Sequence, residues 1–356
     1  MKKMPHCKKN CISFLLTSKC NLNCLYCYSK ESHARQKSLD INFAKKAIDD
    51  FYNQFGHVYL RFFGEGEPTL EMGKIKEIIK YCKKFTNVES ELQTNGFFNE
   101  DTCKWIGKNI DIVWISCDGP EEIQNYYRPA INNTKSSNIV ERNIKYLAKK
   151  VKLGIRTSIG RKNINKQKQI IDYFCVLGVK YIYTDILFKP IGSKLKEESI
   201  SPLEYAKKFI IAKRYAAHKN IFYGSFFEIN FDGKTKYFCR FCNPSPHLTT
   251  DNYITCCDMA YNGEIFPEMA YGKYNPKTDI ITYDKKKIKH ILERNVDNMK
   301  ECENCEVKYF CGGGCIGECA NEKGDMFKIK KENCEAIRFL AKKIGCDNGK
   351  YPIYHP

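Results

Sequence analysis

Residues 17–30 read TSKCNLNCLYCYSK and carry three cysteines, Cys20, Cys24 and Cys27, in the spacing C-x3-C-x2-C. A structural zinc site usually closes with four protein ligands. Three cysteines so close together therefore indicate a metal centre that keeps one coordination position open. The apolar stretch Cys11–Thr17 precedes the triplet and predicts a strand that leads directly into it.

Strand-like and helix-like segments alternate along the first half of the chain. Short apolar runs predict strands at Cys11–Thr17, Val58–Phe63, Glu91–Thr94, Ile112–Cys117, Leu153–Ile159 and Tyr181–Phe188. Amphipathic segments between them predict helices at Asn42–Phe55, Ile75–Phe85, Asp101–Lys108, Asn138–Lys150 and Asn165–Leu177. Such alternation favours parallel βαβ units, but six units are too few to close an eight-unit barrel. The expected fold class is α/β, with a partial (β/α)6 TIM-like barrel whose functional residues lie at the carboxyl ends of the strands.

The composition changes after this barrel. We expect a connector over residues 201–236, with a helix near Leu203–Lys219, and a second domain over residues 237–356. Ten cysteines occur between positions 239 and 334, together with many glycines and little apolar periodicity. A region of this composition folds poorly on a hydrophobic core alone, so metal binding is the expected source of its stability. The predicted barrel domain then covers residues 1–200.

Charge and cysteine content restrict the compartment and the partners. The 356 residues contain 20 cysteines and carry a formal net charge of +18. No apolar run is long enough for a membrane span or a secretory signal, so a cytoplasmic location is expected. In a reducing compartment, clustered cysteines hold metal more often than disulfides. The positive charge suggests an anionic partner, but the lysines are dispersed and no RNA-binding motif is present, so nucleic acid is not the favoured partner.

The cysteine triplet after the first strand resembles the signature of the radical S-adenosylmethionine (SAM) superfamily. The resemblance implies that Cys20, Cys24 and Cys27 hold three irons of a [4Fe–4S] cluster, while the fourth iron chelates SAM. An electron from the cluster then cleaves SAM and releases a 5′-deoxyadenosyl radical. A zinc site is the competing interpretation of the triplet.

Further segments resemble the SAM-binding loops of that superfamily. They are RFFGEGEPTL after the second strand, LQTNG after the third and ISCDGP after the fourth. Simple turns and surface ion pairs would also account for most of these residues. Glu65 departs from the pattern, since the superfamily usually has glycine there. The resemblance implies a set of SAM contacts: Tyr26, Gly64, Glu65, Gly66, Glu67, Asn95, Ser116, Asp118, Arg128 and Arg156.

The later motif CENCEVKYFCGGGC has the spacing C-x2-C-x5-C-x3-C. It resembles the SPASM domain, which carries two auxiliary [4Fe–4S] clusters and would bring the total to three. Asn252 stands where that family has a glycine with positive φ, and asparagine is the next best residue for that conformation. Two structural zinc sites are the alternative, and Cys256 and Cys319 are spare candidates. The resemblance implies two ligand sets, Cys239, Cys242, Cys257 and Cys315 for one cluster and Cys302, Cys305, Cys311 and Cys334 for the other.

SPASM-bearing enzymes mostly modify peptides or proteins, so the resemblance implies hydrogen abstraction from a peptide: cross-linking, oxidation or epimerisation. Anaerobic sulfatase maturation, which forms formylglycine, is a named alternative. By the same resemblance Asp258, next to Cys257, is the candidate catalytic base, and a raised pKa is expected for it.

The implied partners are a peptide or protein substrate, an electron donor such as flavodoxin or ferredoxin, and a separate leader-recognition protein. Two other readings stay open. One is a radical SAM enzyme that acts on nucleic acid, and the other is a non-catalytic metal-binding module.

Overall fold

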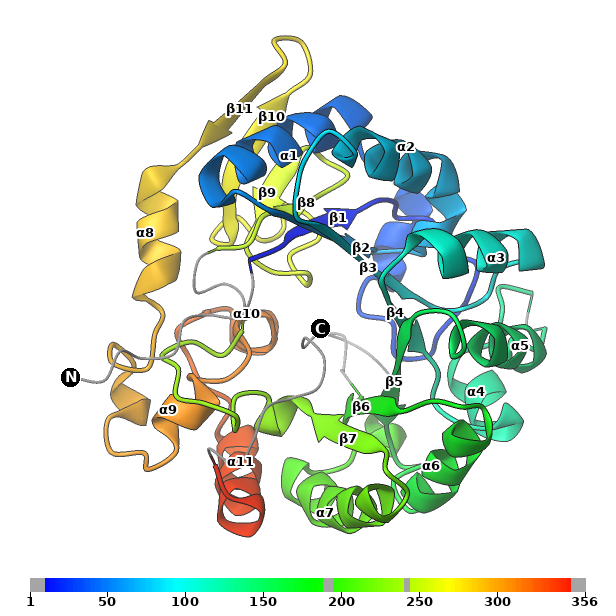
Figure 1. The fold of residues 1–356 in the computed structure, drawn as a ribbon. Helices are drawn as coiled ribbons and strands as arrows, with labels where there is room; N and C mark the ends of the chain where they lie inside the picture. Colours follow the sequence, from blue (N-terminus) through cyan, green and yellow to red (C-terminus); the bar gives the residue numbers. More distant parts are fainter. Residues whose placement is uncertain (1–9, 133, 188–194, 240–243, 347–356) are drawn as a thin grey trace.

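The computed structural model describes residues 10–132, 134–187, 195–239 and 244–346. Seven strands pair in parallel and in chain order, each hydrogen-bonded to the next. Figure 1 shows them curving around the middle of a ring, with the helices that connect them on the outside. The seven strands are β1 (Ile12–Leu15), β2 (Val58–Phe63), β3 (Val88–Thr94), β4 (Ile112–Ser116), β5 (Lys152–Ile159), β6 (Tyr181–Ile186) and β7 (Phe222–Ser225).

Helices follow the strands on the outer face and bury one apolar stripe each. In α1, Asp40 caps the amino end by accepting hydrogen bonds from the Asn42 and Phe43 amides, and Gly56 ends the helix with φ of 68°. The outer helices are α1 (Ile41–Phe55), α2 (Met72–Cys82), α3 (Glu100–Asn109), α4 (Glu121–Tyr127), α5 (Ser137–Leu147), α6 (Gln167–Val176) and α7 (Pro202–His218). Short 3-10 helices are η1 (Lys30–Arg35), η2 (Pro68–Glu71), η3 (Leu195–Glu198) and η4 (Phe226–Glu228).

The C-terminal residues complete the ring on the side away from β2–β5 (Figure 1). Their strands are β8 (His247–Leu248), β9 (Tyr253–Thr255), β10 (Ala270–Asn275) and β11 (Ile280–Tyr283), and their helices are α8 (Lys285–Glu293), η6 (Lys300–Cys302), α9 (Lys308–Cys311), α10 (Ile316–Lys323) and α11 (Lys331–Ile344). Strand β8 pairs in parallel with β1, so one sheet of 11 strands runs through both parts. Helix α11 packs against α7. The division into domains at residues 200 and 237 stays a prediction.

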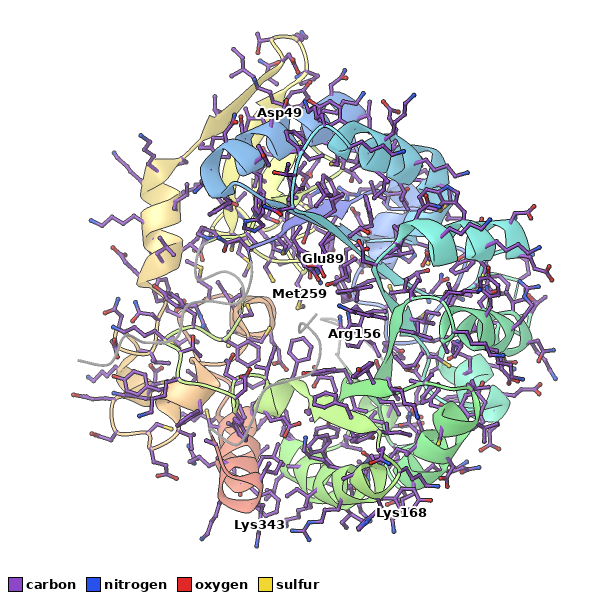
Figure 2. All side chains as sticks on the ribbon, viewed as in Figure 1. Asp49, Glu89, Arg156, Lys168, Met259 and Lys343 are labelled. Atoms are coloured by element: carbon purple, nitrogen blue, oxygen red, sulfur yellow. The ribbon has the colours of Figure 1, made fainter. Side chains whose placement is uncertain are left out.

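Side chains alternate along each strand, so that one set packs into the outer core and the other set lies on the inner face of the sheet. Ile182 and Ile186 of β6 pack into the large core under the helices, whereas Tyr183 packs with Tyr59 and Trp114 on the inside of the ring. We use the word lumen for the region enclosed by these inner faces, which side chains such as Tyr59, Trp114 and Tyr183 partly fill. In Figure 2 the labelled side chains of Glu89, Arg156 and Met259 lie toward this lumen, and those of Asp49, Lys168 and Lys343 lie on the periphery.

The predicted fold class is confirmed, with one extension. All six predicted strands are present within a few residues of their expected bounds. Strand β7 was not predicted, because its four residues, FYGS, include a glycine and are too short to show alternation. The strands β8–β11 were also missed, since they are short and lie in the segment that was expected to lack periodic elements. Among the described residues, no helix is long and apolar enough to cross a membrane.

Candidate active site

The cysteine loop lies at the carboxyl end of β1 and is anchored on both sides. The Ser18 amide donates to the Lys37 carbonyl at 3.0 Å, within the same connection between β1 and α1. The Leu25 amide donates to the Tyr127 carbonyl at 2.9 Å, at the end of α4. The loop therefore spans the mouth of the barrel, where the carboxyl ends of the strands gather.

Each of the three thiols has a polar neighbour that can donate to sulfur. Arg128 Nη1 lies 3.7 Å from Cys24 Sγ, and Asn95 Nδ2 lies 4.0 Å from Cys20 Sγ. Cys27 Sγ lies 3.5 Å from Ser29 Oγ and 3.8 Å from His33 Nε2. Donors placed around sulfur stabilise thiolate ligands and orient them. Cys20, Cys24 and Cys27 form no disulfide bond.

Burial destabilises the charged thiolate form of these cysteines unless a nearby cation compensates the charge. It raises the pKa of Cys20 to about 12 and that of Cys24 to about 11. Burial would also raise the pKa of Cys27, but hydrogen bonds with His33 and Ser29 lower it below its ordinary value. Positively charged irons bound to the three thiolates compensate their negative charge.

Tyr26, Asp118 and Arg128 form one cluster beside Cys24. The Tyr26 hydroxyl donates to Asp118 Oδ2 at 2.5 Å and accepts from Arg128 Nε at 2.7 Å. Arg128 also pairs with Asp118 at 3.2 Å, and the Ser158 amide donates to Asp118 Oδ1 at 2.8 Å. Burial raises the pKa of Asp118, although Arg128 opposes part of the rise. Three of the residues predicted to contact SAM thus lie together against the cysteine loop.

The glycine-rich loop packs directly on the cysteine loop. The Gly66 amide donates to the Thr17 carbonyl at 2.8 Å, and the Glu67 amide donates to the Lys19 carbonyl at 2.7 Å. The Glu67 carboxylate accepts from the Asn95 amide at 2.7 Å and from Thr94 Oγ1 at 2.6 Å. Glu67 therefore fixes the position of Asn95, which in turn reaches Cys20.

The side chain of Glu65, the residue that departs from the superfamily pattern, has different partners from that of Glu67. Its buried carboxylate pairs with Arg35 and accepts from Thr250 Oγ1 at 3.3 Å. Thr250 belongs to the C-terminal part of the chain, so Glu65 ties the glycine-rich loop to that part. The Gly64–Gly66 turn remains tight, because a Cβ at Gly64 would lie 2.3 Å from the Gly66 carbonyl oxygen.

Gly66→Ala is expected to displace the cysteine loop. A Cβ at Gly66 would lie 2.0 Å from the Lys19 carbonyl oxygen and 2.6 Å from the Lys19 carbonyl carbon, both backbone atoms that cannot rotate away. We expect a loss of about 1–3 kcal/mol of stability and incomplete loading of the first cluster, measured by thermal unfolding and iron content. Gly73→Ala in α2 is the control, since its Cβ would meet nothing within 4 Å. Alanine there is expected to stabilise the helix slightly, and equal behaviour of the two variants would contradict the packing argument.

Arg156 and Ser116 do not join this cluster. Arg156 donates to Gln93 Oε1 at 2.9 Å, deeper along the inner face of the sheet, and Ser116 lies beside it in the register of β4 and β5. Burial and the nearby Arg61 guanidinium lower the pKa of Arg156. These contacts of Arg156 and Ser116 do not include the cysteine loop, and their assignment as SAM contacts stays a prediction.

The raised pKa expected for Asp258 is wrong. Its carboxylate accepts from Arg61 Nη1 at 2.8 Å and lies 3.1 Å from His247 Nε2. Burial would raise the pKa of Asp258, but Arg61 and His247 hold it well below its ordinary value. The sequence did not reveal this pairing, because Arg61 is 197 positions away. Arg61 and His247 thus favour the ionised form of the Asp258 carboxylate, and a role in proton transfer stays a prediction.

Arg61 joins Asp258 to a buried network across the lumen wall. Arg61 Nε donates to Glu91 Oε1 at 3.0 Å, and Arg61 Nη1 donates to Ser13 Oγ at 3.1 Å. Gln93 Nε2 also donates to Glu91 Oε1, at 3.0 Å. The signal that sequence reasoning overlooked is a charged residue at an inward position of a strand, as Arg61 is in VYLRFF.

The C-terminal cysteines gather in two places. Burial, followed by neighbouring thiols that include Cys334, raises the pKa of Cys302 to about 11 and that of Cys311 to about 12. A cavity of about 420 Å³ is lined by this set, whose four members are Cys302, Cys305, Cys311 and Cys334. Burial, with Cys315 and Cys239 as neighbours, raises the pKa of Cys257. Cys242, the fourth member of this second set, lies outside the described residues.

The two spare cysteines lie close to the second set, since Cys256 acts on the charge of Cys257 and Cys319 acts on that of Cys315, and both have further contacts. Cys256 is buried in the main core, and its amide donates to the Met269 carbonyl at 3.0 Å. Cys319 Sγ accepts from Arg294 Nη2 at 3.8 Å. Arg294 is fully buried and also donates to the Gly313 carbonyl at 3.0 Å, so it places a cation among the cysteine loops. Nothing in the sequence singled out Arg294.

Two turn conformations expected from the sequence are confirmed. Asn252 has φ of 67°, the left-handed conformation that a glycine would adopt there. The three glycines from Gly312 to Gly314 have φ of 68°, 82° and 76°, which lets the chain curl between Cys311 and Cys315.

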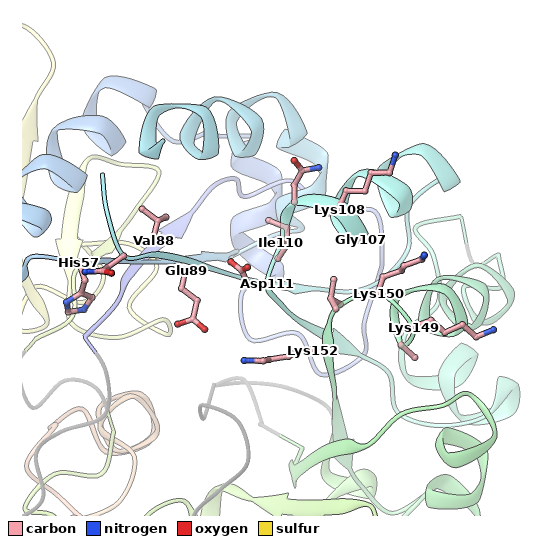
Figure 3. Close-up of a pocket in the computed structure, with 14 residues that line it drawn as sticks. His57, Val88, Glu89, Gly107, Lys108, Ile110, Asp111, Lys149, Lys150 and Lys152 are labelled. Atoms are coloured by element: carbon pink, nitrogen blue, oxygen red, sulfur yellow. The ribbon is translucent and has the colours of Figure 1, made fainter. Parts of the chain in front are cut away.

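A larger open groove lies at the opposite end of the strands. It measures about 1140 Å³ and is lined by the amino ends of β3–β5, with lysines at positions 108, 149, 150 and 152. Figure 3 shows these side chains together with His57 and Glu89. None of the predicted metal ligands within the described residues lines this groove, so we place the candidate active site at the carboxyl ends of the strands instead.

The residues present fit an iron–sulfur cluster with SAM. Three thiols with sulfur-directed donors lie at the mouth of the barrel, and soft thiolates are the ligands that such clusters use. Asn95 and Arg128 supply polar groups next to the thiols, and Asp118 pairs with Arg128.

Comparison with known proteins agrees with this fit. Residues 14–174 match the model of the radical SAM superfamily. An uncharacterised protein of Methanocaldococcus jannaschii is 35% identical over 179 residues, which cover 48% of this chain and 60% of that protein. The cysteine-type anaerobic sulfatase-maturating enzyme of Clostridium novyi is 25% identical over 327 residues, which cover 84% of this chain and 85% of that enzyme.

A solved structure supports the fold over nearly the whole chain. Native anSMEcpe with bound AdoMet and the Cp18Cys peptide superimposes with a TM-score of 0.76 at 20% identity, covering 93% of this chain and 95% of that one. The cysteine-rich C-terminal part is consistent with a SPASM-like domain. Residues 14–174 therefore form a radical SAM domain, and the chain is an enzyme related to the anaerobic sulfatase-maturating enzymes, with SAM and [4Fe–4S] clusters as the cofactors.

Proposed function

We propose that this enzyme oxidatively modifies a peptide or protein segment that enters the lumen. The observation that carries the proposal is the placement of two cysteine-rich regions on the same lumen. Cys20, Cys24 and Cys27 follow β1, and the helices α9–α11, which carry several of the C-terminal cysteines, complete the ring on the other side (Figure 1). A radical source and an electron acceptor on two sides of one space suit a two-electron oxidation.

When bound, SAM and its cluster supply a 5′-deoxyadenosyl radical that abstracts a hydrogen atom. In our proposal, Cys20, Cys24 and Cys27 hold that cluster, and Arg128 and Asn95 orient the ligands through their contacts with sulfur. The loop at Gly66 brings backbone groups close to the same place. The two auxiliary clusters would be held by the remaining sets, Cys239, Cys242, Cys257 and Cys315, and Cys302, Cys305, Cys311 and Cys334.

Sulfatase maturation is the first specific reaction to test. The relative from Clostridium novyi carries that activity in its name, and the solved structure holds a peptide with its AdoMet. Both support a substrate recognised as a short peptide segment. A reducing protein such as flavodoxin or ferredoxin would supply electrons, and a separate leader-recognition protein is the further partner to look for if ribosomal peptides are the substrates.

Anaerobic incubation with SAM, dithionite and candidate peptides tests the proposal. The peptides are a sulfatase segment with cysteine or serine at the target position, and short peptides encoded by neighbouring genes. We expect formation of 5′-deoxyadenosine together with a peptide that has lost two hydrogens, or in which a cysteine has become formylglycine, as seen by mass spectrometry. Cleavage of SAM without a change in any peptide, in the presence of RNA that becomes modified, would overturn it.

Asp258→Asn is expected to separate SAM cleavage from product formation. The variant leaves the cysteine loop untouched but removes the carboxylate that links Arg61 to His247 beside the lumen. We expect 5′-deoxyadenosine near the wild-type level and less modified peptide, because Arg61 and His247 lose the carboxylate that holds them in place. Asp297→Asn, on a surface ion pair with Lys236, is the control and should not change either product. Full peptide turnover by the Asp258 variant would remove this residue from the mechanism.

A further inference from the structure

A second carboxylate, Asp185, lies at the carboxyl end of β6 and faces the lumen. Side chains alternate along the strand, and Tyr183 packs inward with Trp114 and Tyr59. Asp185, two positions later, is on the same face, and it pairs in register with Ser158 of β5. The Ser158 amide donates to Asp118 in the cluster beside Cys24. Asp185 is therefore at the end of the sheet that carries the cysteine loop.

The C-terminal part approaches Asp185 from the other side. Glu318 of α10 is close enough to act on its charge, as are Lys330 before α11 and Arg156 of β5. Glu318 itself pairs with Lys330 at 2.6 Å and lines the cavity that holds Cys302, Cys305, Cys311 and Cys334. Asp185 thus lies between the two cysteine-rich regions.

Within the part of the chain that the structure describes, few groups stabilise the negative charge of the Asp185 carboxylate. Among the described residues, no cation lies within 4.0 Å of it, and the hydrogen bond that it accepts comes from the amide of its own neighbour, Ile186, at 2.9 Å. Asp185 is partly exposed to solvent. This contrasts with Asp258, whose oxygens are both engaged by Arg61 and His247.

We propose that Asp185 is the proton acceptor of the reaction. The proposal rests on the proposed function, because it assigns the base for a two-electron oxidation of a peptide side chain. A hydrogen atom leaves the substrate carbon for the 5′-deoxyadenosyl radical, which becomes 5′-deoxyadenosine. Asp185 takes the proton from the thiol or hydroxyl on that carbon, and the remaining electron passes to an oxidised iron–sulfur cluster. The carbon–sulfur or carbon–oxygen double bond forms as the S–H or O–H and C–H bonds break.

The titration of Asp185 suits this task. Burial and the neighbouring Glu318 carboxylate raise its pKa to about 7, and Arg156 and Lys330 offset only part of the rise. Tyr205 of α7 is a further titratable neighbour of Asp185. A base with a pKa near the working pH is both deprotonated and strong enough to accept a proton.

Asp185→Asn in the reconstituted holoenzyme tests the proposal. We expect a loss of peptide product of about 10²-fold or more, with SAM cleavage close to wild type, and partial recovery in Asp185→Glu. Wild-type turnover should rise with pH through a midpoint near the pKa of Asp185, and this step should vanish in the Asn variant. Asp172→Asn, an exposed aspartate of α6 paired with Lys219, is the control.

Infrared difference spectroscopy gives a readout that needs no substrate. A carboxyl band should titrate near neutral pH in the wild-type holoenzyme and be missing from Asp185→Asn. The folded protein binds this proton more tightly than the unfolded chain does, so ionisation disfavours folding as pH rises from about 4. The melting temperature of the Asn variant should therefore exceed that of wild type increasingly up to a pH of about 7 and by a constant amount above it.

Two outcomes would overturn the assignment: full peptide turnover in Asp185→Asn with an unchanged pH profile, or no carboxyl titration near neutral pH. Absence of any peptide product from the wild type would instead count against the proposed function, since the infrared titration reports on Asp185 without substrate.

Discussion

Replacing Cys20, Cys24 and Cys27 together by alanine is expected to abolish SAM cleavage. These thiols lie in one loop at the mouth of the barrel, each beside a polar donor from a different part of the chain. Without them the first cluster has no protein ligands, while the C-terminal cysteines are unchanged. The anaerobically reconstituted wild type should contain about 12 irons per chain and the variant about eight. The assay is iron content with 5′-deoxyadenosine formation.

Cys175→Ala is the matched control, because Cys175 lies on the outer helix α6, away from all three cysteine sets. It should keep the wild-type iron content and activity. A triple variant that still releases 5′-deoxyadenosine would show that the open-site interpretation of the triplet is wrong. A wild type with only about four irons would contradict the two auxiliary clusters.

Arg61→Met is expected to destabilise the protein by about 3–5 kcal/mol, the range for breaking a buried ion pair by removing one partner. Arg61 has only 1% of its surface exposed and pairs with both Glu91 and Asp258. Methionine fills much of the same volume but removes the Arg61 cation from the buried Glu91 carboxylate and the partly buried Asp258 carboxylate. Thermal unfolding of the reconstituted protein should show a large decrease in melting temperature.

Arg161→Met is the control for that loss. Arg161 pairs with Glu204 at 2.8 Å, but its side chain is 50% exposed. Exposed ion pairs contribute about 1 kcal/mol or less, so the melting temperature should hardly change. Adding Glu91→Gln to Arg61→Met should recover part of the stability, since one unpaired charge is then removed. If the double variant is no more stable than Arg61→Met, the loss comes from packing and not from charge.

Local patterns were sufficient for the parts of the site that lie close together in the chain. Cys20, Cys24 and Cys27 are in one loop, and their spacing alone indicated an open metal centre. Asn252 was expected to take a positive φ because few residues other than glycine tolerate that conformation, and its φ is 67°. The order of the parallel strands also followed from alternation and short connections.

Contacts between residues far apart in the chain determined the pKa shifts that the sequence could not show. A raised pKa was expected for Asp258 from its neighbour Cys257, but the ion pair with Arg61 lowers it. Asp185 looked like an ordinary strand residue, and only its neighbours from β5 and α10 reveal a carboxylate with little compensation. Strand β7 was missed because four residues are too few to show a period.

The sequence by itself therefore determined the fold class, the cofactor chemistry and the residues whose spacing is local. Only the tertiary structure decided which charges meet in the lumen and hence which carboxylates are held ionised. The physical reason is that a pKa depends on burial and on charges a few ångströms away, and those neighbours come from strands and helices far apart in the chain.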